Sequence, residues 1–315
     1  FNKIASIEPK GKTITLAFGE ICGLSSNDSF YAENLLEEID LPGEYFIDRR
    51  KGMLYVLPTN DFDEAHITVS TLTDSMINAI NVEHVTFREL VFDTSRASAL
   101  HINGKAICIE SCEIVRQGDR ALWMIGTDHT IASCNIHHVG GTAIELAGGD
   151  LETLKPSWCV VENSHVHHWG SWMRVYNPAI SLLGVGHVVR HSEFNHFQHM
   201  AIEVRGNDHL IEYNLFHDGP RDFVDMGVIS GNLGHRPHHR GTVIRRNFFR
   251  EVALAKSKQC AIYVDNGTMD WVIEGNIFYR NGISEPKHFG AIFTGGGSYL
   301  DIRYNIFVNC PSTFT

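Results

Sequence analysis

Apolar and polar residues alternate in a six-residue phrase that recurs nine times along this chain. The copies are Phe87–Phe92, Ile109–Ile114, Ile131–Ile136, Val161–Val166, Val189–Phe194, Ile211–Phe216, Ile244–Phe249, Ile273–Phe278 and Ile302–Phe307. The shortest interval between copies is 22 residues, and it occurs three times. Because the longer intervals are the same unit with insertions, the pattern predicts a solenoid of stacked repeats.

A second apolar alternation, four residues long, recurs between copies of this phrase. Its clearest copies are Ala143–Leu146, Ala179–Leu182, Ala201–Val204, Val228–Gly231, Ala261–Val264 and Ala291–Thr294. Short runs of β-branched and aromatic residues, broken by Gly and Asn, indicate strands rather than helices. Two or three strands per 22 residues make one turn of a parallel β-helix, whose coils stack at about 4.8 Å.

The fourth residue of each six-residue phrase forms a column of its own. The column is Leu90, Cys112, Cys134, Ser164, Ser192, Asn214, Asn247, Asn276 and Asn305. Stacked amides can hydrogen-bond from coil to coil and to buried backbone groups, so we expect a structural ladder here. The two cysteines are then expected to be buried thiols.

Residues 1–75 lack the repeat. They contain a strand pattern at 12–16 and a hairpin in which 44–47 and 53–56 flank the turn 48–52. A solenoid exposes apolar surface at its ends, so we expect this segment to cap a β-helix formed by residues 76–315, about nine coils long. The chain starts at Phe1 without Met and stops at Thr315 without a second cap, so we interpret it as a truncated or processed chain.

Composition narrows the class of protein. The apolar fraction is 43%, which suffices for a core, and the net charge of −11 disfavours a nucleic-acid partner. We expect no membrane span, because there is no apolar run of 18 residues. Seven cysteines without paired spacing predict neither a disulfide framework nor a zinc site. Two sequons, at Asn27 and Asn266, favour a secreted or periplasmic location.

The insertions cluster on both sides of the four-residue strand. Before this strand, the lengthened connections are 166–179, 216–228, 249–261 and 278–291. From this strand to the next six-residue phrase, the lengthened stretches are 143–161 and 228–244. Loops stacked on either side of one sheet face predict a groove with two walls. Functional residues often lie on loops beside such a groove on a rigid scaffold. The alternative is drift, since solenoid turns tolerate insertion.

Strand alternation predicts which residues face this groove. The expected floor is Glu203, Arg205, Ser230, Asn232, Tyr263, Asp265 and Phe293. The expected wall residues include Trp172, Arg174, Tyr176, Asp222, Asp225, Lys256, Lys258 and His288 on one side, and His235, Arg236, His238, His239 and Arg240 on the other. Carboxylates, cations and aromatic rings together suit a sugar. An oligo- or polysaccharide is therefore the predicted partner, and no cofactor is predicted.

Two carboxylates beside a glycosidic bond suffice for its hydrolysis. Asp225 and Asp265 are the first candidate pair, although about 23 Å of extended chain separates their strand positions. Glu203 is the substitute partner, two coils and about 10 Å from Asp265. Asp-Asn-Gly at 265–267 is also a common turn sequence, and Asp225 could be a solvated loop acid.

Histidines offer other chemistry. His235, His238 and His239 could bind a metal, but such a loop is more typical of plain polar surface, and no metal is predicted. The pairs His137-His138 and His167-His168, with His196, are expected to stack or to hydrogen-bond from coil to coil.

A lyase is the second enzymatic reading. Lys258 or His288 would remove a proton beside a uronate carboxylate that Arg205 or Arg174 neutralises. A non-catalytic glycan-binding or structural β-helix stays open as the third alternative, since fold does not fix function.

Several segments resemble right-handed parallel β-helix carbohydrate-active proteins, nearest to glycoside hydrolase family 141. They are residues 34–48 with 52–55, 225–229, 240–247, 261–267 and 295–297. The resemblance implies an all-β, right-handed parallel β-helix and places the two family carboxylates on Asp225 and Asp265. From the predicted floor and walls, and not from the resemblance, we assign substrate-binding roles to Arg205, Tyr263, Lys258, His288, Asn232, Trp172 and His238. The chain departs from the family pattern at Ser230, Asn232 and Asn266, which leaves the substrate open.

Overall fold

The structure of the chain is a computed structural model that describes residues 2–19, 32–231, 239–284 and 289–315. The chain forms two compact units, Phe1–Thr68 and Val69–Thr315. Each unit has strands of its own, and they are described separately.

The first unit consists of two antiparallel hairpins and two short 3-10 helices. Its elements are β1 (Ile4–Glu8), β2 (Thr13–Leu16), η1 (Leu36–Glu38), β3 (Tyr45–Asp48), β4 (Met53–Val56) and η2 (Phe62–Glu64). β3 pairs with β4 from Tyr45↔Val56 to Asp48↔Met53, around the Gly-containing turn that the sequence predicts. The hairpin prediction is confirmed, whereas the capping role stays a prediction.

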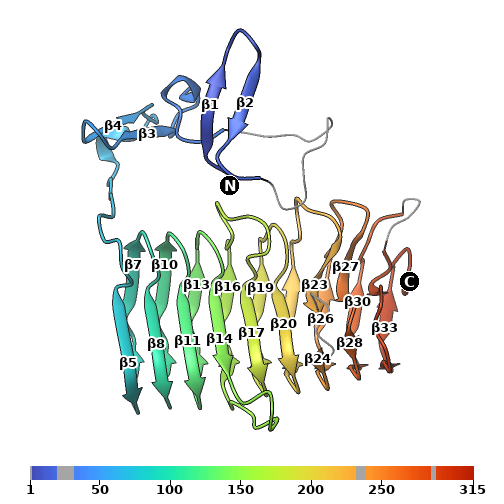
Figure 1. The fold of residues 1–315 in the computed structure, drawn as a ribbon. Coiled ribbons are helices and arrows are strands. Elements are labelled where there is room, and N and C mark those ends of the chain that lie inside the picture. The colour runs from blue at the N-terminus through green and yellow to red at the C-terminus, as the bar shows by residue number, and fades with distance from the viewer. Residues whose placement is uncertain (1, 20–31, 232–238, 285–288) are drawn as a thin grey trace. The chain divides into compact units, whose positions relative to one another are not determined.

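The second unit is a parallel β-helix of three nine-stranded sheets (Figure 1). Sheet 1 contains β5 (Ile77–Glu83), β8 (Leu100–Lys105), β11 (Leu122–Thr127), β14 (Ile144–Gly148), β17 (Ile180–Val185), β20 (Ile202–Asn207), β23 (Met226–Gly231), β27 (Gln259–Val264) and β31 (Ile292–Thr294). Sheet 2 contains β6 (Thr86–Arg88), β9 (Cys108–Glu110), β12 (Thr130–Ala132), β15 (Val160–Glu162), β18 (Val188–Arg190), β21 (Leu210–Glu212), β25 (Val243–Arg245), β29 (Val272–Glu274) and β32 (Asp301–Arg303). Sheet 3 contains β7 (Val91–Ser95), β10 (Glu113–Gln117), β13 (Asn135–His137), β16 (His165–His167), β19 (Glu193–Asn195), β22 (Leu215–His217), β26 (Phe248–Arg250), β30 (Ile277–Tyr279) and β33 (Ile306–Val308).

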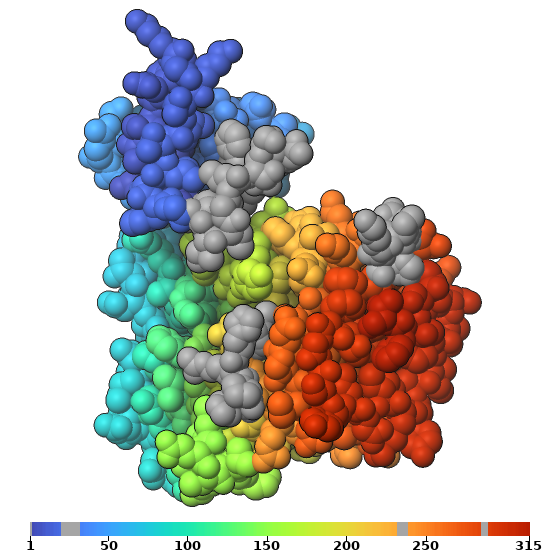
Figure 2. Space-filling view, turned by 45° about the vertical axis from the view of Figure 1, so that its right-hand side comes forward, coloured from blue at the N-terminus to red at the C-terminus, as the bar shows by residue number. Residues whose placement is uncertain are grey.

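Each coil contributes one strand to each sheet, so sequence repeats become spatial neighbours. The six-residue phrase forms a strand of sheet 2 and a strand of sheet 3, and the four-residue phrase lies in sheet 1. A further short pair, β24 (His239–Arg240) with β28 (Thr268–Met269), lies outside the three sheets. In the space-filling view, successive coils of the second unit follow one another as bands of changing colour (Figure 2).

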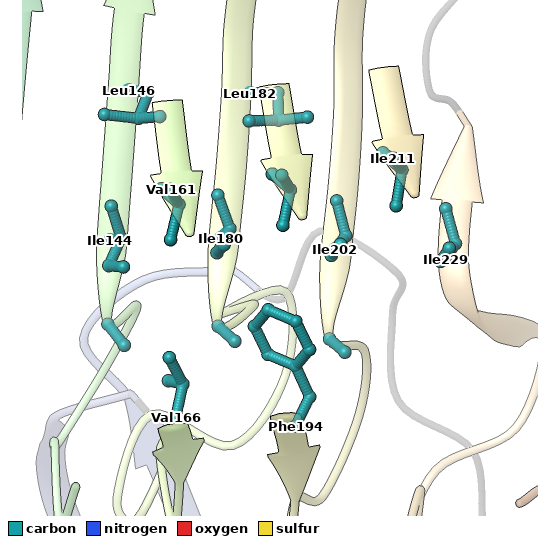
Figure 3. Packing of buried hydrophobic residues seen from close by; sticks show 14 of the residues in the cluster. Ile144, Leu146, Val161, Val166, Ile180, Leu182, Phe194, Ile202, Ile211 and Ile229 are labelled. Carbon is teal, nitrogen blue, oxygen red and sulfur yellow. The ribbon is translucent and has the colours of Figure 1, made fainter. Parts of the chain in front are cut away.

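The core is a set of aligned apolar columns inside the coils. Ile144, Ile180, Ile202 and Ile229 lie in register along sheet 1, and each is fully buried (Figure 3). The aromatic column of sheet 3 stacks ring on ring at 4.8–5.0 Å, and its members are Phe194, Phe216, Phe249, Phe278 and Phe307. Repeated burial of the same position in every coil is what the apolar ends of the phrase predict.

The predicted amide ladder stands at the bend between sheets 2 and 3. The Nδ2 atom of Asn247 donates to Oδ1 of Asn276 at 3.0 Å and to the carbonyl of Ile211 at 2.9 Å. Asn214 and Asn276 repeat this arrangement one coil away on either side. Earlier in the column, Cys134 is a buried thiol beside backbone carbonyls, and burial raises its pKa to about 11. Both structural predictions for this column are confirmed.

Among the residues that the structure describes, no helix is long and apolar enough to cross a lipid bilayer.

Candidate functional site

The outward row of sheet 1 holds the predicted floor residues. Glu203, Ser230, Tyr263 and Phe293 occupy one register position in four successive coils. Alternation is as expected, but Glu203, Ser230 and Tyr263 are only 2%, 3% and 8% exposed. These three positions of the expected open floor are therefore closed to solvent, whereas Arg205, on the same face of β20, is exposed.

Asp225 and Tyr263 meet across two of these coils. Asp225 directly precedes β23, has a left-handed backbone (φ 65°), and its N–H donates to the carbonyl of Lys258 at 2.8 Å. The hydroxyl of Tyr263, in β27, donates to Oδ1 of Asp225 over 3.2 Å. The length of the tyrosine side chain therefore links the loop acid to the sheet face, and the loop does not have to fold over the strand.

Asp265 lies two residues after the same tyrosine. It follows the last residue of β27, is partly exposed, and its carbonyl accepts from the N–H of Thr268 at 3.1 Å. Burial raises the pKa of Tyr263, and the negative charges of Asp265 and Asp225 and the hydrogen bond to Asp225 raise that pKa further. Tyr263 therefore stays protonated at neutral pH and lies within the field of both acids.

Glu203 is engaged in an ion pair rather than open to a ligand. Its Oε1 accepts from Nη2 of Arg205 at 2.5 Å, and its Oε2 accepts from the hydroxyl of Ser181 at 3.0 Å. The side chain of Arg205 is 45% exposed, whereas that of Glu203 is 2% exposed. This geometry suits a carboxylate that orients Arg205 toward the surface.

The predicted wall before sheet 1 is a chain of contacts between successive loops. Arg174 forms an ion pair with Asp222. The ring of His199 lies 5.0 Å from that of Tyr176 and 5.7 Å from that of Phe223. Burial lowers the pKa of His199 to about 4, so the imidazole is neutral. These loops are therefore joined to one another, and the walled groove stays a prediction.

Other predicted residues lie apart or outside the described chain. The indole N–H of Trp172 donates to the carbonyl of Gly118 at 2.6 Å, which places it against earlier coils. Lys258 is exposed at the start of β27, beside Asp225. Asn232, His238 and His288, and with them His235 and Arg236, lie outside the described residues.

An aromatic group completes the C-terminal side of the site. Phe289 and Phe293 stack at 3.8 Å, and Tyr263 lies 5.0 Å from Phe293 and 5.7 Å from Phe289. Alternation identified Phe293, but Phe289 and His199 carried no signal in the sequence. Both lie in connections before sheet 1, where neither strand period nor repeat register fixes the direction of a side chain.

A surface depression of about 410 Å³ lies elsewhere, at the bend between sheets 2 and 3. Its lining residues are Asn163, Ser164, His165, His191, Ser192, Glu193, Tyr213 and Leu215. None of the predicted site residues lines it, so the candidate site rests on the Asp225–Tyr263–Asp265 arrangement and not on this hollow.

Comparison with known proteins supports the fold. The family model described as "Right handed beta helix region" matches residues 153–314. A solved structure titled "Glycoside hydrolase" has a TM-score of 0.62 and 12% sequence identity over 88% of this chain and 57% of its own. This chain thus spans little more than half the length of that protein. An alginate lyase from Paenibacillus sp. str. FPU-7 has a TM-score of 0.39 and 13% identity, over 67% of this chain and 79% of its own.

No curated protein sequence matches the chain. Identities this low show the fold alone, and the nearer assignment to glycoside hydrolase family 141 stays a prediction. The family model covers just over half of the 315 residues, and the three parallel sheets agree with its description. The chain belongs to the right-handed β-helix family.

Proposed function

We propose that this chain is a carbohydrate-active protein that hydrolyses a glycosidic bond with Asp225 and Asp265. The observation that carries the proposal is Tyr263, which hydrogen-bonds to Asp225 and lies in the field of Asp265. Two carboxylates near one protonated hydroxyl supply the groups that an acid–base hydrolysis needs. The fold likeness to a glycoside hydrolase agrees with this chemistry but does not establish it.

The two acids take complementary roles in this proposal. One of Asp225 and Asp265 is the general acid that protonates the leaving oxygen, and the other is the base or nucleophile. Asp225 accepts the hydrogen bond of Tyr263, and Asp265 is partly exposed at the end of β27. Tyr263, which is 8% exposed, holds Asp225 in place behind the surface of the site.

The surroundings suit a sugar ring. Phe289 and Phe293 are partly exposed and stacked beside Tyr263, and aromatic rings cover the apolar face of a pyranose. Arg205 is held at the surface by Glu203 and can donate hydrogen bonds to sugar hydroxyl groups. An oligo- or polysaccharide is therefore the proposed substrate, and a secreted or periplasmic location is the matching proposal.

Two features favour hydrolysis over β-elimination. Tyr263 has a raised pKa, so it is a poor base for removing a proton beside a uronate. The charge of Arg205 is already partly neutralised by Glu203, which weakens it as the partner of a uronate carboxylate. Lys258 is the remaining described candidate for a lyase base.

One screen separates the three possibilities. The chain is incubated with a panel that includes fucosylated glycans, xylan and uronate polymers. New reducing ends without ultraviolet-absorbing products support hydrolysis, whereas an unsaturated uronate signal supports a lyase. Binding of a panel member without any product would show a non-catalytic glycan-binding protein and would refute the proposal.

A further inference from the structure

Five histidines form a stacked column at the end of sheet 3. His137 ends β13 and His138 follows it, His167 ends β16 and His168 follows it, and His196 follows β19 one coil later. The rings of His137 and His167 are 4.7 Å apart and those of His138 and His168 are 4.8 Å apart, with interplanar angles of 5° and 3°. The coil-to-coil stack that the sequence predicts is confirmed. Ring stacking does not determine which partners the ring nitrogens have.

Within each coil, two ring nitrogens face one another. The Nδ1 atoms of His137 and His138 are 2.7 Å apart, and so are those of His167 and His168. Two neutral imidazoles at this distance share one proton, so one Nδ1 is a donor and the other offers a lone pair. Each coil therefore presents two convergent nitrogens with a single hydrogen between them.

A carboxylate fixes the tautomer of the first ring. Nε2 of His137 lies 3.1 Å from Oε1 of Glu113, one coil earlier. An ionised carboxylate only accepts, so Nε2 carries the proton and Nδ1 of His137 is the lone pair that faces His138. Carboxylate–imidazole pairs of this kind orient the histidine ligands of metal ions.

The second ring of each pair lies at the surface of the coil. His138 is exposed and His168 partly exposed, which leaves the nitrogens reachable from solvent.

We propose that His137-His138 and His167-His168 are two stacked imidazole clamps for a late first-row divalent ion such as Cu²⁺, Ni²⁺ or Zn²⁺. Binding moves the shared proton of each pair from Nδ1 to Nε2 of the second ring, so the charge on the imidazoles does not change. Two nitrogens bound to one ion at about 2.0–2.1 Å lie roughly 3 Å apart, so each pair opens by a few tenths of an ångström. Imidazole suits these ions, whereas Mg²⁺ and Ca²⁺ prefer oxygen.

Water fills the remaining positions of each clamp. Within the described parts of the chain, no three His, Cys, Asp or Glu side chains converge to hold a metal. A two-nitrogen chelate agrees with that finding, whereas a closed structural site would not. The proposal is independent of the sugar site on sheet 1.

The test is a titration of the untagged full chain with CuCl₂, NiCl₂, ZnCl₂ and, as a hard-ion control, MgCl₂ at neutral pH. The informative variant is His138→Asn with His168→Asn. Both positions have a left-handed backbone (φ 53°), which Asn tolerates, and Asn309 adopts the same φ at the corresponding turn of the last coil. His191→Asn is the matched control, because His191 is exposed, has φ 51° and stacks on Tyr213 rather than on a second imidazole.

We expect the wild type and His191→Asn to bind Cu²⁺ and Ni²⁺ alike and to ignore Mg²⁺. The double variant should lose affinity on the order of 100-fold, because each chelate is reduced to one nitrogen. Electron paramagnetic resonance of the Cu²⁺ form of the wild type should show nitrogen ligation, a readout that needs no variant to fold. Equal affinity and stoichiometry in the wild type and double variant, or no nitrogen coupling, would overturn the proposal.

Discussion

The hydroxyl of Tyr263 donates a hydrogen bond to Oδ1 of Asp225, 3.2 Å away, across two successive coils of the β-helix. Asp225 belongs to a loop before β23 and Tyr263 to the middle of β27, so 38 residues of chain separate them. This contact turns an exposed loop acid into part of the sheet-1 site, and the first prediction depends on it.

Replacing Tyr263 with Phe removes the hydroxyl and keeps the ring on Phe293. A hydrogen bond to a charged group contributes about 1.5–3 kcal/mol, so we expect kcat to fall roughly 10- to 100-fold on whichever glycan the chain cleaves. The free energy of unfolding should also fall, by about 1–2 kcal/mol, because the same bond is lost from the folded protein. Tyr304→Phe, at a tyrosine that is 81% exposed on the last coil, is the control and should leave kcat unchanged. Unaltered kcat in Tyr263→Phe would remove the hydroxyl from the mechanism.

Asn247 lies in the middle of the amide ladder and is fully buried. Its replacement by Ala removes the bonds to the carbonyl of Ile211 and to the backbone N–H and Nδ2 of Asn214, so we expect a loss of about 2–4 kcal/mol in the free energy of unfolding. Asn305 is partly exposed at the last coil, so we expect Asn305→Ala to lower the free energy of unfolding by only about 1 kcal/mol. Urea unfolding measures both, and equal losses would contradict the ladder account.

Two neighbouring phenylalanines test the register of sheet 3. Phe249 is fully buried in the aromatic column, whereas Phe248 points outward and is 37% exposed. We expect Phe249→Ala to lower the free energy of unfolding by about 3–5 kcal/mol and Phe248→Ala by less than about 1 kcal/mol. A one-residue shift of register would reverse this order in the thermal or urea unfolding data.

Stability should fall as the solution becomes acidic. Burial lowers the pKa of His187 to about 4, below its ordinary 6.5, so the unfolded chain binds this proton more readily than the folded chain does. The contribution is complete above about pH 6.5 and is lost as pH falls toward 4, amounting to about 2 kcal/mol by pH 5. Urea unfolding at pH 7.5 and pH 5 measures the loss.

A matched variant assigns part of that loss. His187→Asn should be less stable at neutral pH, because His187 hydrogen-bonds to Ser157 and to the carbonyl of Leu183. Its stability should nevertheless vary less between pH 7.5 and pH 5. The same pH dependence in both proteins would show that His187 is not the titrating group.

Much of the fold could be predicted from the sequence because a repeat imposes its own geometry. Once Ile202, Ile229 and Ile262 align, Glu203 and Tyr263 must face outward, and the Asn column must form a ladder. Burial of the outward row could not be predicted, since it depends on loops of unequal length that follow no period. The Asp225–Tyr263 contact was equally inaccessible, because it depends on the direction of one long side chain and on the left-handed backbone of Asp225.

The histidine column shows the same division. The sequence predicts that His137 and His138 stack on His167 and His168, because the pairs recur at corresponding positions of adjacent coils. It does not predict that neighbouring Nδ1 atoms converge at 2.7 Å. That distance follows from the left-handed turn at His138 and His168, which only the backbone reveals.

Release of reducing ends by Asp225→Asn and Asp265→Asn, beside the wild type, tests the central claim most directly. Asp270→Asn is the control, because Asp270 is exposed and its left-handed backbone (φ 57°) suits Asn. We expect both site variants to lose on the order of 10²–10⁴-fold in kcat on a glycan that the wild type cleaves, with Asp270→Asn unchanged. Undiminished hydrolysis by either site variant would contradict the account.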